Sequence, residues 1–333
     1  MPSSWLQIYH RTELLLHQKF LEIAFGADWN LFQNLRLDGS ILPEEASDAS
    51  RIQALYDTFF LRDLNENHGR ASRVWTSMMY EAFPELQGMD IARLLTYLTI
   101  VTWRWRRSGR ASFQFIEYFC GEGNLSKALL RINRRGLPLD IRLNPAHNFL
   151  LAGGIRFAVL ALMTTQNALI WFGTPCSSWS IICMVWSRRY EENFFLGDES
   201  FEFVRIGNRL MDFTALMYLF GFCIATFVVL EQPRDSVLPK CTSMKLVLNF
   251  SCSGKILTYG AAFGSGSLKP WQIWSVDSAI MTLARRRPDI STSSLMTHTD
   301  SGFSGNRDLI RASEVYPPGF GLAVAEMVQS RRA

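Results

Sequence analysis

Apolar positions along the chain change their spacing near residue 110. Before that point, apolar side chains recur at intervals that place them on one face of a helix. They are Leu14, Leu15, Leu16, Phe20, Leu21 and Ile23, followed by Ile52, Leu55 and Phe59. After it, short apolar runs alternate with helical stretches, a pattern typical of βαβ units around a parallel sheet. We expect a mainly helical region over residues 1–110 and an α/β domain over residues 111–333, with the boundary near Gly109.

Four short apolar runs are the predicted strands of the sheet. They span Phe113–Phe119, Leu137–Ile141, Ala168–Phe172 and Phe227–Leu230. A helix is expected over Leu125–Arg131, after the first strand. Ligands of open α/β sheets bind beyond the carboxyl ends of the strands. The residues that follow each run are therefore the candidates for chemistry.

The longest uncharged stretch runs from Phe213 to Leu230 and reaches the lower length limit of a membrane-spanning helix. Gly221 interrupts it, and its β-branched end is typical of a buried strand. We expect a buried helix that runs into a strand, and no membrane association. Residues 289–306 are rich in Ser, Thr, Gly and Asp and are predicted to form a loop.

Composition indicates a folded protein, with 48% hydrophobic and 19% charged residues. The six cysteines contain no CxxC pair, so neither a metal site nor a disulfide framework is predicted. No secretory signal is recognised, and we expect a nuclear or cytoplasmic protein. The formal net charge of +4 is compatible with a nucleic-acid partner. The basic, aromatic stretch from Trp103 to Arg110 could contact phosphates and bases, or could be a solvated helix end.

A glycine-containing turn, Cys120-Gly121-Glu122-Gly123-Asn124, follows the first predicted strand. Glycines at such a turn let the backbone approach a ligand, and the next helix directs its N-terminus at it. Asp140 ends the second strand, where an acid could bind ribose hydroxyls. The turn and the acid together favour a nucleoside cofactor, with ordinary βα-turn chemistry as the alternative.

Two further polar groups follow strands. Cys176 comes after Pro175, beyond the strand that ends at Phe172, and Glu231 directly follows Leu230. A cysteine is often a small buried apolar residue, so Cys176 alone does not establish a nucleophile. A carboxylate next to a buried strand is costly unless it is paired or functional. The thiol, the carboxylate and the glycine turn are expected at one edge of the sheet.

These residues resemble the motifs of the cytosine-5 DNA methyltransferases, in order and spacing. FCGEGNLSKALL is similar to the cofactor-binding FxGxGG motif, TPCSSWS to the Pro-Cys motif, and LEQP to the Glu-Asn-Val motif. YGAAFGSGSLKPWQIWSV and YPPGFGLAVAEMV are weakly similar to the late arginine-bearing segment and the last helix. The resemblance implies a Rossmann-like class I methyltransferase domain with a mostly parallel, seven-stranded sheet.

The resemblance also implies a role for each residue. The Cys176 thiolate would attack C6 of a flipped-out cytosine, and Glu231 would hold the ring at N3. S-adenosyl-L-methionine would methylate C5 of the cytosine in DNA, with RNA as the alternative substrate. Its binding site would be made by Glu117, Phe119, Gly121, Gly123, Asn124, Asp140 and Pro175. The substrate would contact Ser177, Ser178, Gln232 and Lys269.

Some positions depart from the family pattern. Asn124 replaces a glycine, which predicts a strained cofactor turn, and Ser177 and Gln232 replace a Gln and an Asn. The late arginine pair is absent, which leaves Lys269 as the nearby cation. Only a short loop takes the place of a target-recognition domain.

Two alternatives therefore stay open. One is a catalytically inactive relative that binds nucleic acid or a protein. The other is a thiol-dependent hydrolase in which His147 serves as the base of Cys176.

Overall fold

The structure, a computed structural model, describes most of the chain from residue 69 onward. The described residues are 69–92, 113–163, 165–224, 226–288, 296–299, 302–305 and 314–331, with a few helical positions between 94 and 102. The chain divides into two compact units, one of residues 1–112 and 146–166, the other of residues 113–145 and 167–333. The helices expected around Leu14 and Ile52, and the stretch from Trp103 to Arg110, lie outside the described residues.

The described part of the first unit is helical. It contains α5 (Gly69–Ala82), the 3₁₀ turn η2 (Pro84–Leu86) and α8 (Ala152–Met163), and α5 packs against α8. Arg156 of α8 donates its Nε–H to the Ala82 carbonyl and lies over the Phe83 ring. A second 3₁₀ turn, η3 (Pro145–His147), lies where the chain enters this unit.

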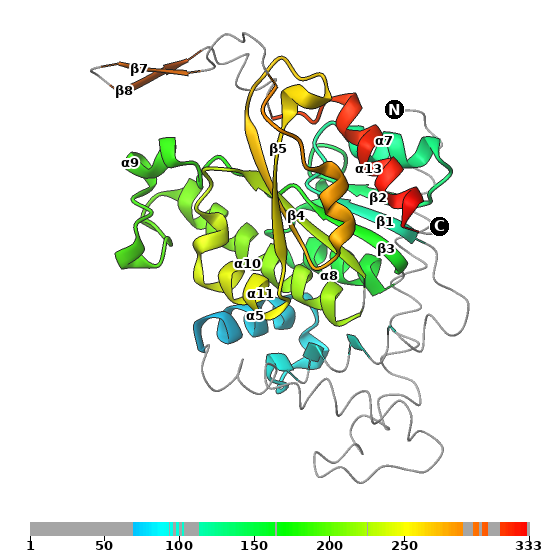
Figure 1. The fold of residues 1–333 in the computed structure, drawn as a ribbon. Coiled ribbons are helices and arrows are strands. Elements are labelled where there is room, and N and C mark those ends of the chain that lie inside the picture. Colours follow the sequence, from blue (N-terminus) through cyan, green and yellow to red (C-terminus); the bar gives the residue numbers. More distant parts are fainter. Residues whose placement is uncertain are drawn as a thin grey trace. The chain divides into compact units, whose positions relative to one another are not determined.

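The second unit is built on a six-stranded sheet (Figure 1). Its strands are β1 (Phe113–Tyr118), β2 (Gly136–Leu139), β3 (Thr165–Phe172), β4 (Phe227–Pro233), β5 (Gly254–Tyr259) and β6 (Pro270–Ser275). They lie in the order β2-β1-β3-β4-β6-β5. β1 and β2 pair in parallel, as do β3 and β4, whereas β6 is antiparallel to both β4 and β5. The strand order changes direction between β1 and β3, which is where sheets of this class bind ligands.

The four predicted strands are confirmed, but the expected number of seven is wrong, since the described sheet has six. After β2 the chain passes through η3 into α8, and no strand lies between them. The predicted loop over residues 289–306 contains a hairpin of β7 (Met296–Thr299) and β8 (Gly302–Gly305). These strands are short and mostly polar or glycine, so no apolar alternation marked them.

Helices cover both faces of the sheet. On one face lie α7 (Asn124–Arg131) and α13 (Pro318–Ser330), which pack against each other. On the other lie α10 (Glu202–Cys223) and α11 (Thr242–Phe250), as Figure 1 shows. The core under α7 and α13 also includes the 3₁₀ helix η8 (Ser278–Leu283) and buried side chains of five strands. Its largest members include Phe115, Trp171, Phe227, Trp271 and Phe320.

The uncharged stretch from Phe213 to Leu230 is a buried helix that runs into a buried strand, as predicted. α10 ends at Cys223 and β4 begins at Phe227. Gly221 faces the strand closely, because a Cβ there would come within 2.9 Å of a methyl group of Val228. Among the described residues, no helix combines the length and apolarity needed to cross a membrane.

The segment between β3 and α10 folds around one buried cation, Arg189. This segment contains η4 (Ile181–Cys183), α9 (Met184–Ser187) and η5 (Glu191–Asn193). The Arg189 guanidinium is fully buried and lies 3.5 Å from the ring centre of Trp179. Its hydrogen bonds go to the carbonyls of Ser178, Phe195, Leu196 and Val204, the Ser178 hydroxyl and the Asn208 amide oxygen. Burial lowers the pKa of Arg189 to about 10, which still leaves it charged at neutral pH.

We predict that Arg189→Met lowers the free energy of unfolding by about 3–5 kcal/mol, because several buried carbonyls lose their donor at once. The matched control is Arg188→Met. Arg188 is the neighbouring residue, and its exposed ion pair with Asp198 should contribute little to stability. Urea unfolding of both variants measures the difference, and equal losses would contradict the structural role of Arg189.

Candidate functional site

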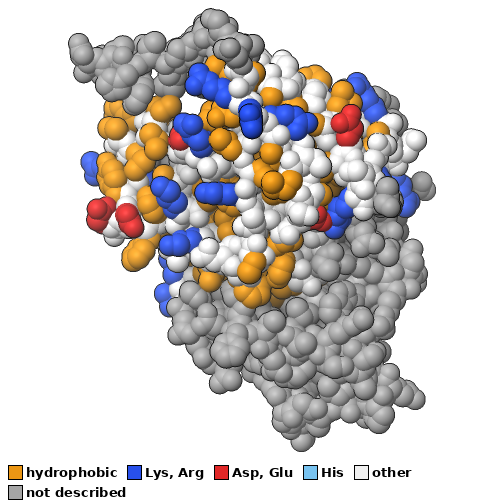
Figure 2. All heavy atoms as spheres, in the orientation of Figure 1, with side chains coloured by type: hydrophobic (Ala, Val, Ile, Leu, Met, Phe, Trp, Pro, Cys, Tyr) orange, Lys and Arg blue, Asp and Glu red, His pale blue; other side chains and the backbone are white. Residues whose placement is uncertain are grey.

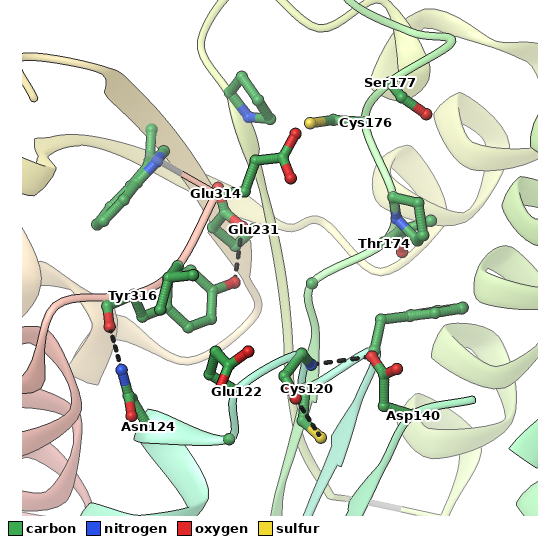
Figure 3. Close-up of a pocket in the computed structure, with 18 of the residues that line it drawn as sticks. Cys120, Glu122, Asn124, Asp140, Thr174, Cys176, Ser177, Glu231, Glu314 and Tyr316 are labelled. Atoms are coloured by element: carbon green, nitrogen blue, oxygen red, sulfur yellow. Dashed lines mark hydrogen bonds between the residues drawn. The ribbon is translucent and has the colours of Figure 1, made fainter. Parts of the chain in front are cut away.

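The carboxyl ends of β1, β2, β3 and β4 meet at a pocket of about 630 Å³ in the second unit (Figure 3). The loops after β1 and β3 form two walls, and residues around β6 and before α13 complete the rim. The lining comprises residues 119–124, 140, 142, 173–177, 231, 233, 269, 271 and 314–316. A pocket of this size can hold a ligand the size of a nucleoside.

The glycine turn forms the wall of the pocket that follows β1. Gly121 and Gly123 have φ angles of 54° and 66°, in the left-handed region that glycine adopts without strain. A Cβ on either residue would meet nothing within 4 Å, so both backbones border open space. Gly123 caps α7 without a side-chain hydrogen bond. The turn therefore leaves room for a ligand beside its backbone, while the Gly123 amide is used within the turn as a donor to the Cys120 carbonyl.

The two predicted acids beside this turn lie in different places. Asp140 lines the pocket, and its Oδ2 accepts a hydrogen bond from the Gly121 amide at 2.9 Å. Glu117 is buried below the pocket and is not among the residues that line it. Its Oε2 accepts hydrogen bonds from the amide and hydroxyl of Ser126 in α7. Through these bonds Glu117 anchors α7 instead of facing the pocket. Burial raises the pKa of Glu117 to about 7.

Asn124 does not strain the turn, contrary to expectation. It is the first residue of α7 and is not among the described residues with positive φ. Its side-chain Nδ2 donates a hydrogen bond to the backbone carbonyl of Tyr316 at 2.8 Å. Asn124 therefore ties the start of α7 to the segment that precedes α13.

Cys176 lies half-buried in the loop after β3, as predicted. Its carbonyl accepts a hydrogen bond from the Trp179 amide at 2.9 Å, which closes a turn. A side chain of β4 fixes the start of this loop, since Gln232 Nε2 donates a hydrogen bond to the Thr174 carbonyl at 2.7 Å. The Val237 amide donates to the Trp179 carbonyl at 2.9 Å. These contacts fix the backbone that carries the thiol.

Of the four predicted substrate contacts, two line the pocket and two do not. Ser177 and Lys269 line the pocket, as does the predicted cofactor contact Pro175. Ser178 and Gln232 are buried and do not line it. Ser178 accepts hydrogen bonds from Arg189, and Gln232 bridges the Thr174 carbonyl and the Ser236 hydroxyl. Both residues support the walls of the pocket from behind.

Glu231 is buried at the end of β4 and receives a hydrogen bond from a distant tyrosine. The Tyr316 hydroxyl donates to Glu231 Oε2 at 2.7 Å, and the same hydroxyl accepts from Trp171 Nε1 at 3.1 Å. Burial raises the pKa of Glu231, while Tyr316 and the cation of Lys269 lower it in part. Burial also raises the pKa of Tyr316 well above its ordinary range, so this phenol stays neutral.

Neighbouring charged groups shift the pKa of the Cys176 thiol in opposite directions. Burial raises its pKa, Lys269 lowers it, and Glu231 and Glu314 raise it. Figure 3 shows the thiol and these two carboxylates at one end of the pocket, with Asp140 at the other. Among the lining residues, acids outnumber cations. The acids are Glu122, Asp140, Glu231 and Glu314, and the cations are Arg142 and Lys269.

Tyr316, Glu314 and Trp171 were not identified from the sequence as site residues. Tyr316 stands at the start of the segment compared with the last helix of the family, which is the one signal that could have drawn attention to it. His147, the base of the hydrolase hypothesis, is buried in the first unit with its ring stacked on Phe157. No histidine is among the described residues that line the pocket, so this hypothesis has no base there.

We predict opposite shifts of the Cys176 titration in two variants. Glu231→Gln removes a negative charge and should lower the thiol pKa, so alkylation accelerates at lower pH than in the parent protein. Lys269→Met removes a positive charge and should raise the thiol pKa. Iodoacetamide labelling over a pH series, read peptide by peptide, measures both, with the exposed Cys252 as the internal reference. Shifts in the same direction would contradict the charge arrangement described.

Comparison with models of known protein families finds no match to this chain. No curated protein matches its sequence either. The fold and the composition of the pocket therefore carry the functional argument.

Proposed function

We propose that this chain transfers a methyl group from S-adenosyl-L-methionine to C5 of cytosine in nucleic acid, DNA in preference to RNA. The observation that carries the proposal is the meeting of three groups in one pocket. The glycine turn with Asp140, the Cys176 thiol and the Glu231 carboxylate come from four different strand ends. They are the groups, in the same order, that carry the resemblance to cytosine-5 methyltransferases.

The residues of the pocket fit the cofactor. Gly121 and Gly123 leave open space beside the backbone, and α7 offers its N-terminus. Asp140 supplies a carboxylate for ribose hydroxyls, and Phe119 an aromatic ring for adenine. The excess of acids among the lining residues suits a ligand with sulfonium and ammonium groups. S-adenosyl-L-methionine, when bound there, supplies an electrophilic methyl group.

The chain's own groups then act on the base. The Cys176 thiol gives its proton to water, a step that the charge of Lys269 favours, and its sulfur forms a bond to C6 of a cytosine that has left the stack. Glu231, whose pKa burial raises, can take up a proton, and the protonated carboxyl group then donates a hydrogen bond or proton to N3 and neutralises the charge that develops on the ring. C5 thereby becomes the nucleophile for the methyl group. Removal of the C5 proton by water then expels the Cys176 thiolate from C6, and N3 returns its proton to Glu231.

A basic segment supports a nucleic-acid substrate. Between the end of β4 and the residues after η8, the chain carries eight lysines and arginines but only two acids, Asp235 and Asp277. The cations are Arg234, Lys240, Lys245, Lys255, Lys269, Arg285, Arg286 and Arg287. Figure 2 shows Lys and Arg side chains outnumbering Asp and Glu on the face that carries β5. Such a face attracts phosphates without reading sequence.

We predict that Cys176→Ser lowers methyl transfer to DNA by about 10³-fold or more, because a serine hydroxyl is a much weaker nucleophile at neutral pH. It should also abolish covalent trapping on DNA that contains 5-fluorocytosine. Cys183→Ser, in the same segment, is the matched control and should retain both activities. Transfer of tritium from labelled cofactor and denaturing gels measure the two effects. Full transfer by Cys176→Ser would contradict the proposed mechanism.

We predict that Asp140→Ala weakens binding of S-adenosylhomocysteine about tenfold or more, through the loss of a charged acceptor and of the tie to Gly121. Asp235→Ala, which removes an exposed acid paired with Arg234, should not change the affinity. Isothermal titration calorimetry measures both constants. An unchanged affinity in Asp140→Ala would place the cofactor elsewhere. Cofactor binding without transfer on any nucleic acid would favour the catalytically inactive alternative.

A further inference from the structure

Three side chains from distant parts of the chain form a row of hydrogen bonds that ends at Glu231. Trp171 lies in β3, Tyr316 precedes α13, and Glu231 lies in β4. The indole Nε1–H of Trp171 can only donate, so the Tyr316 oxygen is its acceptor. The single hydrogen of the neutral phenol is then donated to Glu231 Oε2. The direction of the row is therefore fixed by chemistry.

Because Tyr316 donates to Oε2 alone, the two oxygens of the Glu231 carboxyl group have different hydrogen-bonding surroundings. Oε2 receives the Tyr316 hydrogen and is poorly placed to carry a proton of its own. The Glu231 carboxyl group has no other hydrogen bond within the described part of the chain, and Glu231 lines the pocket. When the carboxyl group is protonated, the proton therefore belongs on Oε1, the oxygen left for a ligand.

We propose that Tyr316 is the positioning residue of Glu231, which holds the carboxyl group in one orientation and keeps its acidic hydrogen on the oxygen that meets the target base. The proposal rests on the proposed function for the identity of that base. Its structural part, the control of Glu231 by Tyr316, does not depend on catalysis.

The surroundings of Tyr316 make this control rigid. Its ring centre lies 5.6 Å from that of Trp271 and 5.1 Å from that of Phe320, so the ring is packed independently of the hydroxyl. Its backbone carbonyl accepts the hydrogen bond of Asn124, next to the glycine turn. Replacement by phenylalanine should remove the hydroxyl and keep the ring in place. Tyr316 also connects the cofactor-side wall of the pocket to the carboxylate.

The charged and titratable groups around Glu231 set the expected pH effects. Lys269, before β6, lowers the pKa of Glu231, and Cys176, after β3, interacts with the Glu231 charge. The charge of Glu314 raises the pKa of Cys176, and the charge of the buried Glu117 raises the pKa of Tyr316. Tyr316 is the hydrogen-bond donor among them, and it stabilises the ionised carboxylate. Loss of its hydroxyl should therefore raise the pKa of Glu231.

The test compares Tyr316→Phe with the parent chain and with Tyr218→Phe. Tyr218 is a buried tyrosine whose hydroxyl bonds to Ser253, outside the pocket, and it serves as the matched control. Carbon-13 NMR of protein labelled at the glutamate carboxyl carbons follows the titration of Glu231, assigned by the signal that Glu231→Gln removes. We expect Glu231 to titrate at higher pH in Tyr316→Phe and to be unchanged in Tyr218→Phe.

Methyl transfer provides the second readout. In Tyr316→Phe we expect kcat to fall about tenfold or more, because the acid loses its orientation, with unchanged affinity for S-adenosylhomocysteine. The alkaline limb of the pH profile should move to higher pH, since the protonated acid persists further. Trp171→Phe removes the donor to Tyr316 and should shift Glu231 in the same direction by less. If Tyr316→Phe does not fold, Trp171→Phe tests the same hydrogen-bond row.

An unchanged Glu231 titration in both Tyr316→Phe and Trp171→Phe would overturn the proposal, as would an unchanged kcat and pH profile in an active enzyme. If the titration shifts but the parent chain methylates no nucleic acid, Tyr316 still controls Glu231 and the proposed reaction is what fails. The two conclusions are thus tested separately.

Discussion

Parallel pairing is the constraint on which the site depends. In a parallel sheet the carboxyl ends of the strands lie at one edge, so residues that follow β1, β2, β3 and β4 meet although the chain separates them by more than a hundred positions. The pairing needs crossover helices, and helices on both faces bury most residues of β1, β2 and β4. What remains exposed at this edge is the set of turns and polar side chains described above.

The same rule explains which site residues could be predicted. Gly121, Asp140, Cys176 and Glu231 each stand just beyond an apolar run, and all of them line the pocket. Gln232, a predicted substrate contact, does not line the pocket because successive side chains of a strand point to opposite faces.

Contacts between residues far apart in the sequence could not be predicted from the positions of apolar runs. Tyr316 meets Glu231 across 85 positions and Asn124 across 192, and no local periodicity encodes either contact. Ser178 likewise serves Arg189, a buried cation whose partners are mostly backbone carbonyls and so leave no trace in residue types. The separate hairpin of β7 and β8 was also harder to predict, since these strands lack an apolar pattern.

The position of Tyr316 in the chain has a consequence for biosynthesis. The ribosome completes every other element of the pocket before residues 314–316 emerge, because these are the last lining residues in chain order. Until then Trp171 and Glu231 lack the hydroxyl that joins them, and Asn124 lacks its acceptor. A nascent chain that already displays Cys176 therefore has an open wall and a free carboxylate. The arrival of the α13 segment completes the pocket as the final step of its assembly.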